Sequence, residues 1–218
     1  MILVLDDLLD AATLGVLQQV AGSLDFEDGR ATAGHQARKV KQNEQAADTD
    51  ARAALLARVA AALNGNLLFQ SAARPRALGQ MLVSRYGPGQ TYGRHVDDAL
   101  MGGQRSDLSF TLFLSDPDSY AGGALVIEDH LEQRHIRLNA GEMVLYPSNT
   151  LHHVSPVTEG TRLAVVGWVT SLLRGPAQRE ILFDLDQAIA RAEAEGASAE
   201  HLLPLLKTRS NLLRMWAE

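Results

Sequence analysis

The hydrophobic and polar positions near the N-terminus follow a helical period. In the first run, between residues 6 and 20, one face consists of Leu9, Ala12, Val16 and Val20. Asp6 or Asp7 is available as its cap. A second run, between residues 48 and 65, has a face made of Leu55, Leu56, Val59 and Leu63. Both patterns predict packing helices. The polar, glycine-containing stretch at residues 26–45 has no clear period, so we expect an irregular segment that forms a wall over a site.

From residue 67 the period changes to two, which is typical of β-strands. The clearest example is residues 108–114, where Leu108, Phe110, Leu112 and Leu114 alternate with Ser109, Thr111 and Phe113. This alternation predicts a half-buried strand. Further short runs lie at residues 81–86, 91–97, 124–127, 135–138, 143–146, 150–154 and 162–169, between glycine and proline turns. Many short strands with no helices between them predict an antiparallel sandwich or barrel. We favour a double-stranded β-helix, the jelly-roll core of cupin-like proteins.

The helical period returns after residue 175. Leu182, Leu185 and Ile189 share one face, and a leucine-rich segment with Pro204 near its start runs from residue 202 to residue 216. We therefore expect a mainly β fold with flanking helices. Residues 1–175 would be a jelly-roll domain with N-terminal helices, and residues 176–218 a C-terminal helical segment packed on the core. These last helices would buttress the sheet or form the contact of a homodimer.

Composition and charge exclude several classes of function. The 218 residues carry a formal net charge of -6 and no long basic run, which argues against nucleic acid as a partner. The chain has no cysteine, so disulfides, thiolate metal sites and cysteine nucleophiles are excluded, and any metal must bind to nitrogen and oxygen ligands. The N-terminus lacks the pattern of a secretory signal, and no apolar stretch is long enough to cross a membrane. We expect a cytoplasmic protein with no membrane partner.

The candidate chemistry lies in two separated strands. His95 and Asp97 are two residues apart on a predicted strand, so their side chains share a face and can hold one ion, whereas Asp98 points away. A third ligand would come from His152 or His153, which point to opposite faces, and periodicity alone does not decide between them. Two imidazoles and one carboxylate on one side of a metal form the facial triad of non-haem Fe(II) oxygenases.

The strand that follows adds a cation. Arg162 offers a planar fork for a carboxylate, and we expect the face that it shares with Ala164, Val166 and Trp168 to line the interior of the roll. The alternative is a cupin-like isomerase or ligand-binding protein that holds a divalent metal without oxidative chemistry. The remaining histidines are expected to have surface or hydrogen-bonding roles: His35, His130, His135 and His201.

The motifs around these residues resemble the PKHD-type hydroxylases. This family consists of bacterial members of the prolyl/lysyl-hydroxylase-like Fe(II)- and 2-oxoglutarate-dependent dioxygenases. The similarity is carried by Tyr92-Gly93-Arg94-His95-Val96-Asp97 and by Leu151-His152. Further matching stretches lie at residues 28–32, 40–43, 85–86, 107–109, 111–117, 122–123, 145–148 and 156–162. The similarity therefore extends over nearly the whole chain.

The resemblance implies a function and assigns roles. It implies that His95, Asp97 and His152 bind Fe(2+), which selects His152 over His153. Arg162 would bind the distal carboxylate of 2-oxoglutarate, and Tyr86 would help to hold this cosubstrate. The reaction would use O2, with ascorbate as reductant, and would hydroxylate a peptide or small-molecule substrate with release of succinate and CO2. Some relatives are linked to iron acquisition, so a link to iron uptake is part of the expectation.

The sequence also departs from the wider prolyl hydroxylase group. Phe113 and Val166 stand where some relatives place hydroxyl-bearing residues. We therefore expect fewer hydrogen bonds around the cosubstrate in this chain.

Overall fold

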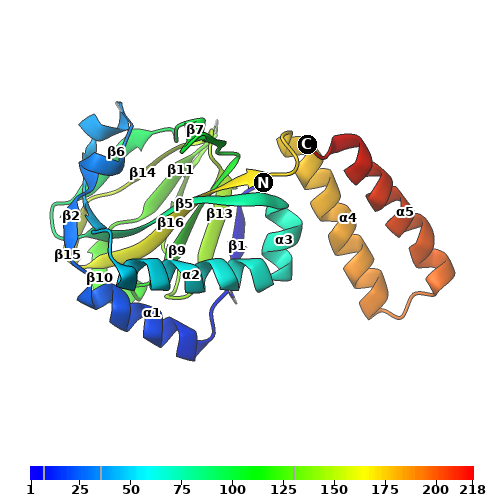
Figure 1. Cartoon of the computed structure of the whole chain (residues 1–218), viewed down its shortest axis with the longest axis horizontal. Coiled ribbons are helices and arrows are strands. Elements are labelled where there is room, and N and C mark those ends of the chain that lie inside the picture. The colour runs from blue at the N-terminus through cyan, green and yellow to red at the C-terminus, as the bar shows by residue number, and fades with distance from the viewer. Residues whose placement is uncertain (7, 35, 130) are drawn as a thin grey trace.

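Two antiparallel sheets form the body of the molecule (Figure 1). The computed structural model describes residues 1–6, 8–34, 36–129 and 131–218, so the expectations for Asp7, His35 and His130 lie outside the described residues. The larger sheet has the order β1 (Leu3–Leu5), β13 (Met143–Pro147), β9 (Leu108–Phe113), β16 (Arg162–Ser171), β5 (Pro75–Tyr86), β4 (Glu44–Ala46) and β2 (Phe26–Asp28). The smaller sheet has the order β12 (Gln133–Ile136), β11 (Leu125–Glu128), β14 (Leu151–Val154), β6 (Thr91–His95) and β3 (Lys41–Gln42).

Shorter elements close the ends of the two sheets. Two further strand pairs are β10 (Tyr120–Gly122) with β15 (Val157–Gly160), and β7 (Leu100–Met101) with β8 (Gln104–Arg105). The described residues also form the short 3-10 helices η1 (Gly29–Thr32), η2 (Ala37–Lys39) and η3 (Pro117–Ser119). Residues from both main sheets line one cavity. This sandwich confirms the predicted jelly roll, and the irregular segment that we expected at residues 26–45 contains β2, η1, η2, β3 and β4.

Three N-terminal helices cover the outer face of the larger sheet (Figure 1): α1 (Ala11–Ser23), α2 (Asp50–Gly65) and α3 (Leu67–Ala73). The prediction for α2 is confirmed, since Leu55, Val59 and Leu63 are its buried residues. The predicted face of α1 is correct only in part: Leu9 and Val20 pack against the core, whereas Ala12 and Val16 are exposed. The helix begins only after Asp10, whose carboxylate caps the amide of Thr13, and the residues that it buries are Leu17 and Ala21.

Residues 67–73 were expected to be extended, and this expectation is also wrong. Asn66 accepts a hydrogen bond from the amide of Phe69, 2.8 Å away, and so caps α3. The helix ends at Arg74, whose φ of 43° lies in the left-handed region. Phe69, Ala72 and Ala73 are buried against the sheet. Tertiary packing therefore determines the conformation of a stretch too short to show a clear period.

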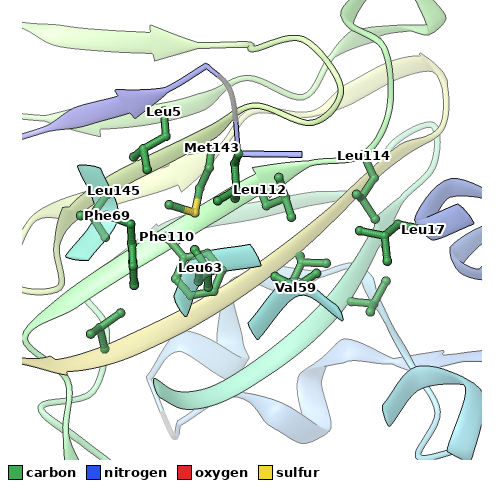
Figure 2. Close-up of a cluster of buried hydrophobic side chains, with 14 of the residues drawn as sticks. Leu5, Leu17, Val59, Leu63, Phe69, Phe110, Leu112, Leu114, Met143 and Leu145 are labelled. Carbon is green, nitrogen blue, oxygen red and sulfur yellow. The ribbon is translucent and has the colours of Figure 1, made fainter. Parts of the chain in front are cut away.

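The main hydrophobic core lies between these helices and the larger sheet (Figure 2). Alternate residues of β9 face this core, and the residues between them face the cavity on the other side of the sheet. All six residues of β9 are buried, so the strand is covered on both faces and not half-buried as predicted. The same alternation in β16 sends Val165 and Val169 to the core and Arg162 and Val166 to the cavity, as expected.

The C-terminal helices α4 (Pro176–Ala194) and α5 (Ala199–Trp216) form a hairpin that extends from one end of the molecule (Figure 1). Asp186 of α4 joins this hairpin to the rest of the chain, because it pairs with Arg74 at the end of α3 and with Arg209 of α5. Within the described ranges, no helix is both long and apolar enough to cross a membrane.

Candidate functional site

Strand pairing brings His95 and His152 together. β6 and β14 are antiparallel neighbours, and His152 is the register partner of His95. The centroids of the two imidazole rings are 4.3 Å apart. Asp97 completes the group, with its Oδ1 atom 3.8 Å from Nε2 of His95 and 3.9 Å from Nε2 of His152. One ligand atom from each residue therefore lies within 4.8 Å of the others.

Asp97 reaches this position in a different way from the one expected. β6 ends at His95, so Asp97 lies two residues beyond the strand and the alternation of a strand does not orient it. Its carboxylate is held instead by Ser109 on β9, whose hydroxyl donates to Oδ2 of Asp97 at 2.5 Å. The hydroxyl oxygens of Ser109 and Ser148 lie 2.8 Å apart, and because Ser109 gives its one proton to Asp97, Ser148 is the donor in this second hydrogen bond. Because Ser109 occupies Oδ2, the Oδ1 atom is left to face the imidazoles.

Backbone carbonyls fix the orientation of both imidazoles. Nδ1 of His95 lies 2.8 Å from the carbonyl of Gly93, and Nδ1 of His152 lies 2.9 Å from the carbonyl of Thr150. A carbonyl accepts only, so each Nδ1 carries a proton, and the neutral form of each ring has its lone pair on Nε2, which faces Asp97. Burial, followed by the charge of His152, lowers the pKa of His95 to about 4. A neutral imidazole at pH 7 is the form that binds a metal.

The neighbouring residues His153 and Asp98 point elsewhere. His153 lies on the opposite face of β14, where its Nδ1 is 3.3 Å from Glu128. Glu128 also accepts two hydrogen bonds from Arg94. Asp98 is exposed at the mouth of the cavity. His135 and His201 are exposed on β12 and α5, in agreement with surface roles. The register of β14 therefore decides which of the two adjacent histidines meets His95.

Arg162 is buried in the same cavity without an anionic partner. Its side chain is among the largest that are fully buried, at 1% exposure, and its Nε atom has no hydrogen-bond partner. Among the described residues, no carboxylate lies within 4.0 Å of its guanidinium. The guanidinium carbon lies 5.3 Å from the ring centroid of Tyr86 and 5.1 Å from that of Phe113. An unpaired buried charge is unfavourable, so the arrangement fits a ligand that brings a carboxylate.

Tyr86 lies beside Arg162 because the two residues are register partners on β5 and β16. Burial raises the pKa of Tyr86 to about 12, so its hydroxyl keeps its proton and can donate a hydrogen bond. Phe113 packs on the guanidinium with its ring, and Val166 lines the cavity wall. Neither of these two side chains can donate a hydrogen bond to a ligand, and the expectation of fewer polar contacts to the cosubstrate stays a prediction.

A cavity of about 310 Å³ contains these groups. Its walls come from both sheets, from residues 31–34 and from residues 100–102. Two imidazoles and one carboxylate whose ligand atoms lie this close together suit a divalent ion such as Fe(II). The guanidinium of Arg162, which has no anionic partner, suits a dicarboxylic acid bound beside that ion.

Sequence reasoning missed Ser109 and Ser148. The available signal was a serine on the cavity-facing side of an otherwise apolar strand.

Comparisons with known proteins agree with this chemistry. The model of the 2OG-Fe(II) oxygenase superfamily matches residues 81–170, and that of the PKHD-type hydroxylase C-terminal domain matches residues 177–218. A PKHD-type hydroxylase of Synechococcus elongatus is 53% identical over the whole of both chains. A second, from Maricaulis maris, is 53% identical over 93% of this chain and 92% of its own.

Solved structures show the same fold at low sequence identity. A crystal structure of a Pseudomonas putida prolyl-4-hydroxylase matches 78% of this chain and 92% of its own, with a TM-score of 0.53 and 19% identity. The viral collagen prolyl hydroxylase of Paramecium bursaria Chlorella virus-1, in a 2OG complex, matches 78% of this chain and 96% of its own, with a TM-score of 0.55 and 17% identity.

The sequence relatives and the two family models show that the chain belongs to the PKHD-type hydroxylases, which are Fe(II)- and 2-oxoglutarate-dependent enzymes of the 2OG-Fe(II) oxygenase superfamily.

Proposed function

We propose that His95, Asp97 and His152 bind Fe(II), and that Arg162 and Tyr86 bind the distal carboxylate of 2-oxoglutarate. The observation that carries this proposal is the guanidinium of Arg162, which is buried without an anion in the cavity that contains the three ligands. The hydroxylated substrate would be a protein or small molecule that reaches the triad through this cavity. Family membership supports oxidative chemistry over the cupin-like alternative.

The side chains of this site prepare the reaction. When bound, iron with 2-oxoglutarate and O2 supplies the oxidative decarboxylation that yields succinate and CO2 and hydroxylates a C–H bond. The carbonyls of Gly93 and Thr150 keep both imidazoles in the tautomer that can bind the metal. Ser109 holds the carboxylate of Asp97 in one orientation. Arg162 would bind the distal carboxylate of the cosubstrate and so orient the molecule in the cavity.

An anaerobic titration tests the assignment of the ligands. Addition of Fe(II) and then 2-oxoglutarate should produce a visible charge-transfer absorption in the wild-type protein. Asp97→Ala should lose this absorption and the iron-dependent release of succinate, because one of three ligands is absent. Asp98→Ala is the matched control, since Asp98 is exposed, and it should keep both signals. Full turnover by Asp97→Ala would refute its role as a ligand.

The same site supports narrower statements about partners and organisation. We propose that residues 1–175 form the catalytic domain and residues 176–218 an added helical unit; limited proteolysis that cuts near residue 175 would support this division.

We also propose that ascorbate acts as reductant and that the protein forms a homodimer. Turnover number with and without ascorbate tests the first, and light scattering tests the second. The link to iron uptake gains no support from the described residues and is not part of the proposal.

A further inference from the structure

Besides Arg162, a second buried cation lines the cavity: Lys41, at the edge of the smaller sheet. β3 pairs with β6 so that Lys41 is the register partner of Tyr92, and their side chains share the face that lines the cavity. Lys41 is 4% exposed. Lysine is rarely buried to this extent unless it is paired with an acid. A buried lysine on the wall of a reaction cavity therefore requires an explanation.

The ammonium group of Lys41 has only neutral neighbours in direct contact. Its Nζ donates to the hydroxyl of Thr32 at 2.9 Å and lies 5.1 Å from the centroid of the Tyr92 ring. No carboxylate of the described chain lies within 4.0 Å of it. An ammonium group has three protons to donate, and one hydrogen bond is recorded here. Two donors are therefore available to a molecule in the cavity.

The position of Lys41 relative to the triad defines what it can bind. Tyr92 stacks on His95, with ring centroids 3.7 Å apart and an interplanar angle of 17°. One aromatic ring therefore separates the ammonium group from the nearest proposed metal ligand. Arg162, which we assign to the cosubstrate, comes from the opposite sheet. Lys41 thus lies at a different wall of the same cavity from Arg162, one aromatic ring away from His95.

The charge of Lys41 persists at neutral pH. Burial lowers the pKa of its ammonium group to about 8, and the negative charges of Asp97 and Asp28 oppose this effect. At pH 7 most molecules therefore carry the positive charge.

We propose that the ammonium group of Lys41, held in place by its hydrogen bond to the hydroxyl of Thr32, binds a carboxylate of the substrate that is hydroxylated. This inference rests on the proposed function, because it takes the triad as the place where the C–H bond reacts. The hydroxyl of Thr32 donates its own proton to the carbonyl of Gly29, so only the ammonium group is a donor to the ligand. A single ammonium group suits a singly charged carboxylate, whereas phosphate sites more often use arginine forks or groups of backbone amides. The substrate would therefore be an organic acid or an acidic residue with the carboxylate a few bonds from the reacting carbon.

Isosteric probes test the chemical class directly. Benzoate, benzamide and phenyl phosphate would be titrated into the anaerobic protein saturated with Fe(II) and 2-oxoglutarate, so that Arg162 is already occupied. Wild type should bind benzoate roughly 10- to 100-fold more tightly than benzamide, as expected for a hydrogen bond between charged groups. Lys41→Met should remove this preference, and Thr32→Val should reduce it. Equal binding of benzoate and benzamide by wild type, or tighter binding of phenyl phosphate than of benzoate, overturns the proposal.

Matched variants separate this role from a structural one. Lys39→Met is the control, because Lys39 is exposed and contacts only Gln36 among the recorded hydrogen bonds. Lys41→Arg keeps the positive charge and should retain a preference for benzoate, and thermal melting confirms that each variant is folded. Loss of 2-oxoglutarate affinity in Lys41→Met would overturn the inference by assigning Lys41 to the cosubstrate. Absence of 2-oxoglutarate binding in wild type would instead refute the proposed function.

A cell extract identifies the source of the carboxylate. The extract would be divided by ultrafiltration, and each fraction tested for stimulation of succinate release before and after its carboxylates are converted to amides. We expect one fraction to stimulate wild type, and amidation or Lys41→Met to abolish the stimulation. Activity in the filtrate indicates a free acid, and activity in the retained fraction indicates an acidic residue of a protein. Stimulation that survives amidation contradicts the proposal.

Discussion

Replacement of Arg162 by methionine should weaken 2-oxoglutarate binding and at the same time stabilise the free protein. Methionine retains the unbranched apolar body of the side chain and removes the guanidinium. In the free protein that guanidinium is buried, with an Nε atom that has no partner. In the complex we expect it to form two charge-assisted hydrogen bonds with the distal carboxylate. The two effects of the substitution therefore have opposite signs.

The structure sets the size of each effect. Two charge-assisted hydrogen bonds at about 1.5–3 kcal/mol each correspond to a loss of roughly 10²- to 10⁴-fold in affinity for 2-oxoglutarate. In the free protein, the desolvation of the Arg162 guanidinium costs several kcal/mol. Cation–π contacts with the rings of Tyr86 and Phe113 offset this cost by about 0.5–2 kcal/mol each. We therefore expect the free energy of unfolding to rise by about 1–3 kcal/mol, which corresponds to a Tm about 3–10 °C higher.

Two measurements decide between this account and a structural role. Isothermal titration gives the Kd for 2-oxoglutarate, and urea unfolding of the metal-free protein gives the free energy of unfolding. Arg85→Met is the matched control, because Arg85 lies on β5 next to Tyr86 but forms a partly exposed ion pair with Glu44. It should lose at most about 1 kcal/mol and keep its affinity. A destabilised Arg162→Met with unchanged 2-oxoglutarate affinity would refute the reasoning.

Three further predictions follow from the site and the core. Ser109→Ala frees Oδ2 of Asp97 and should weaken Mn(II) binding, measured by electron paramagnetic resonance, by about 10- to 100-fold with little change in Tm. His152→Ala should abolish Mn(II) binding in the same assay, whereas His153→Ala should leave it intact, since His153 faces Glu128; equal effects would contradict the assignment. Phe69→Ala removes a fully buried ring and should lower the free energy of unfolding by about 3–5 kcal/mol in urea, without affecting metal affinity.

Local periodicity identified the strands of the sheets and the helices α2, α4 and α5, but it missed α3 and gave only part of the buried face of α1. Alternation identified β5, β9 and β16 because every second side chain of a strand faces the same layer. Alternation did not reveal that both faces of β9 are buried. The face that points away from the main core lines the cavity, and segments far away in the sequence form the rest of that cavity. The buried face of α1 was predicted only in part for a similar reason. Helices that pack on a sheet expose some apolar residues, such as Val16, and bury others.

The candidate site shows the same division. His95, Asp97, His152 and Arg162 could be selected from residue type, spacing and resemblance, because a facial triad and a carboxylate fork require particular side chains. Ser109 and Lys41 were not selected. A serine and a lysine are common residues, and only their burial and their neighbours distinguish them.

The amino-acid sequence by itself determined the strand-rich class of the fold, the absence of thiolate chemistry and the residue types available to a metal, because these depend on composition and short-range pattern. Only the tertiary structure decided that His152 meets His95 and that the carboxylate of Asp97 is oriented by a serine from another sheet. It also decided that Lys41 and Arg162 are buried on the wall of one cavity with no carboxylate of the described residues beside them. The physical reason is that register, burial and the pairing of charges depend on contacts between residues far apart in the chain.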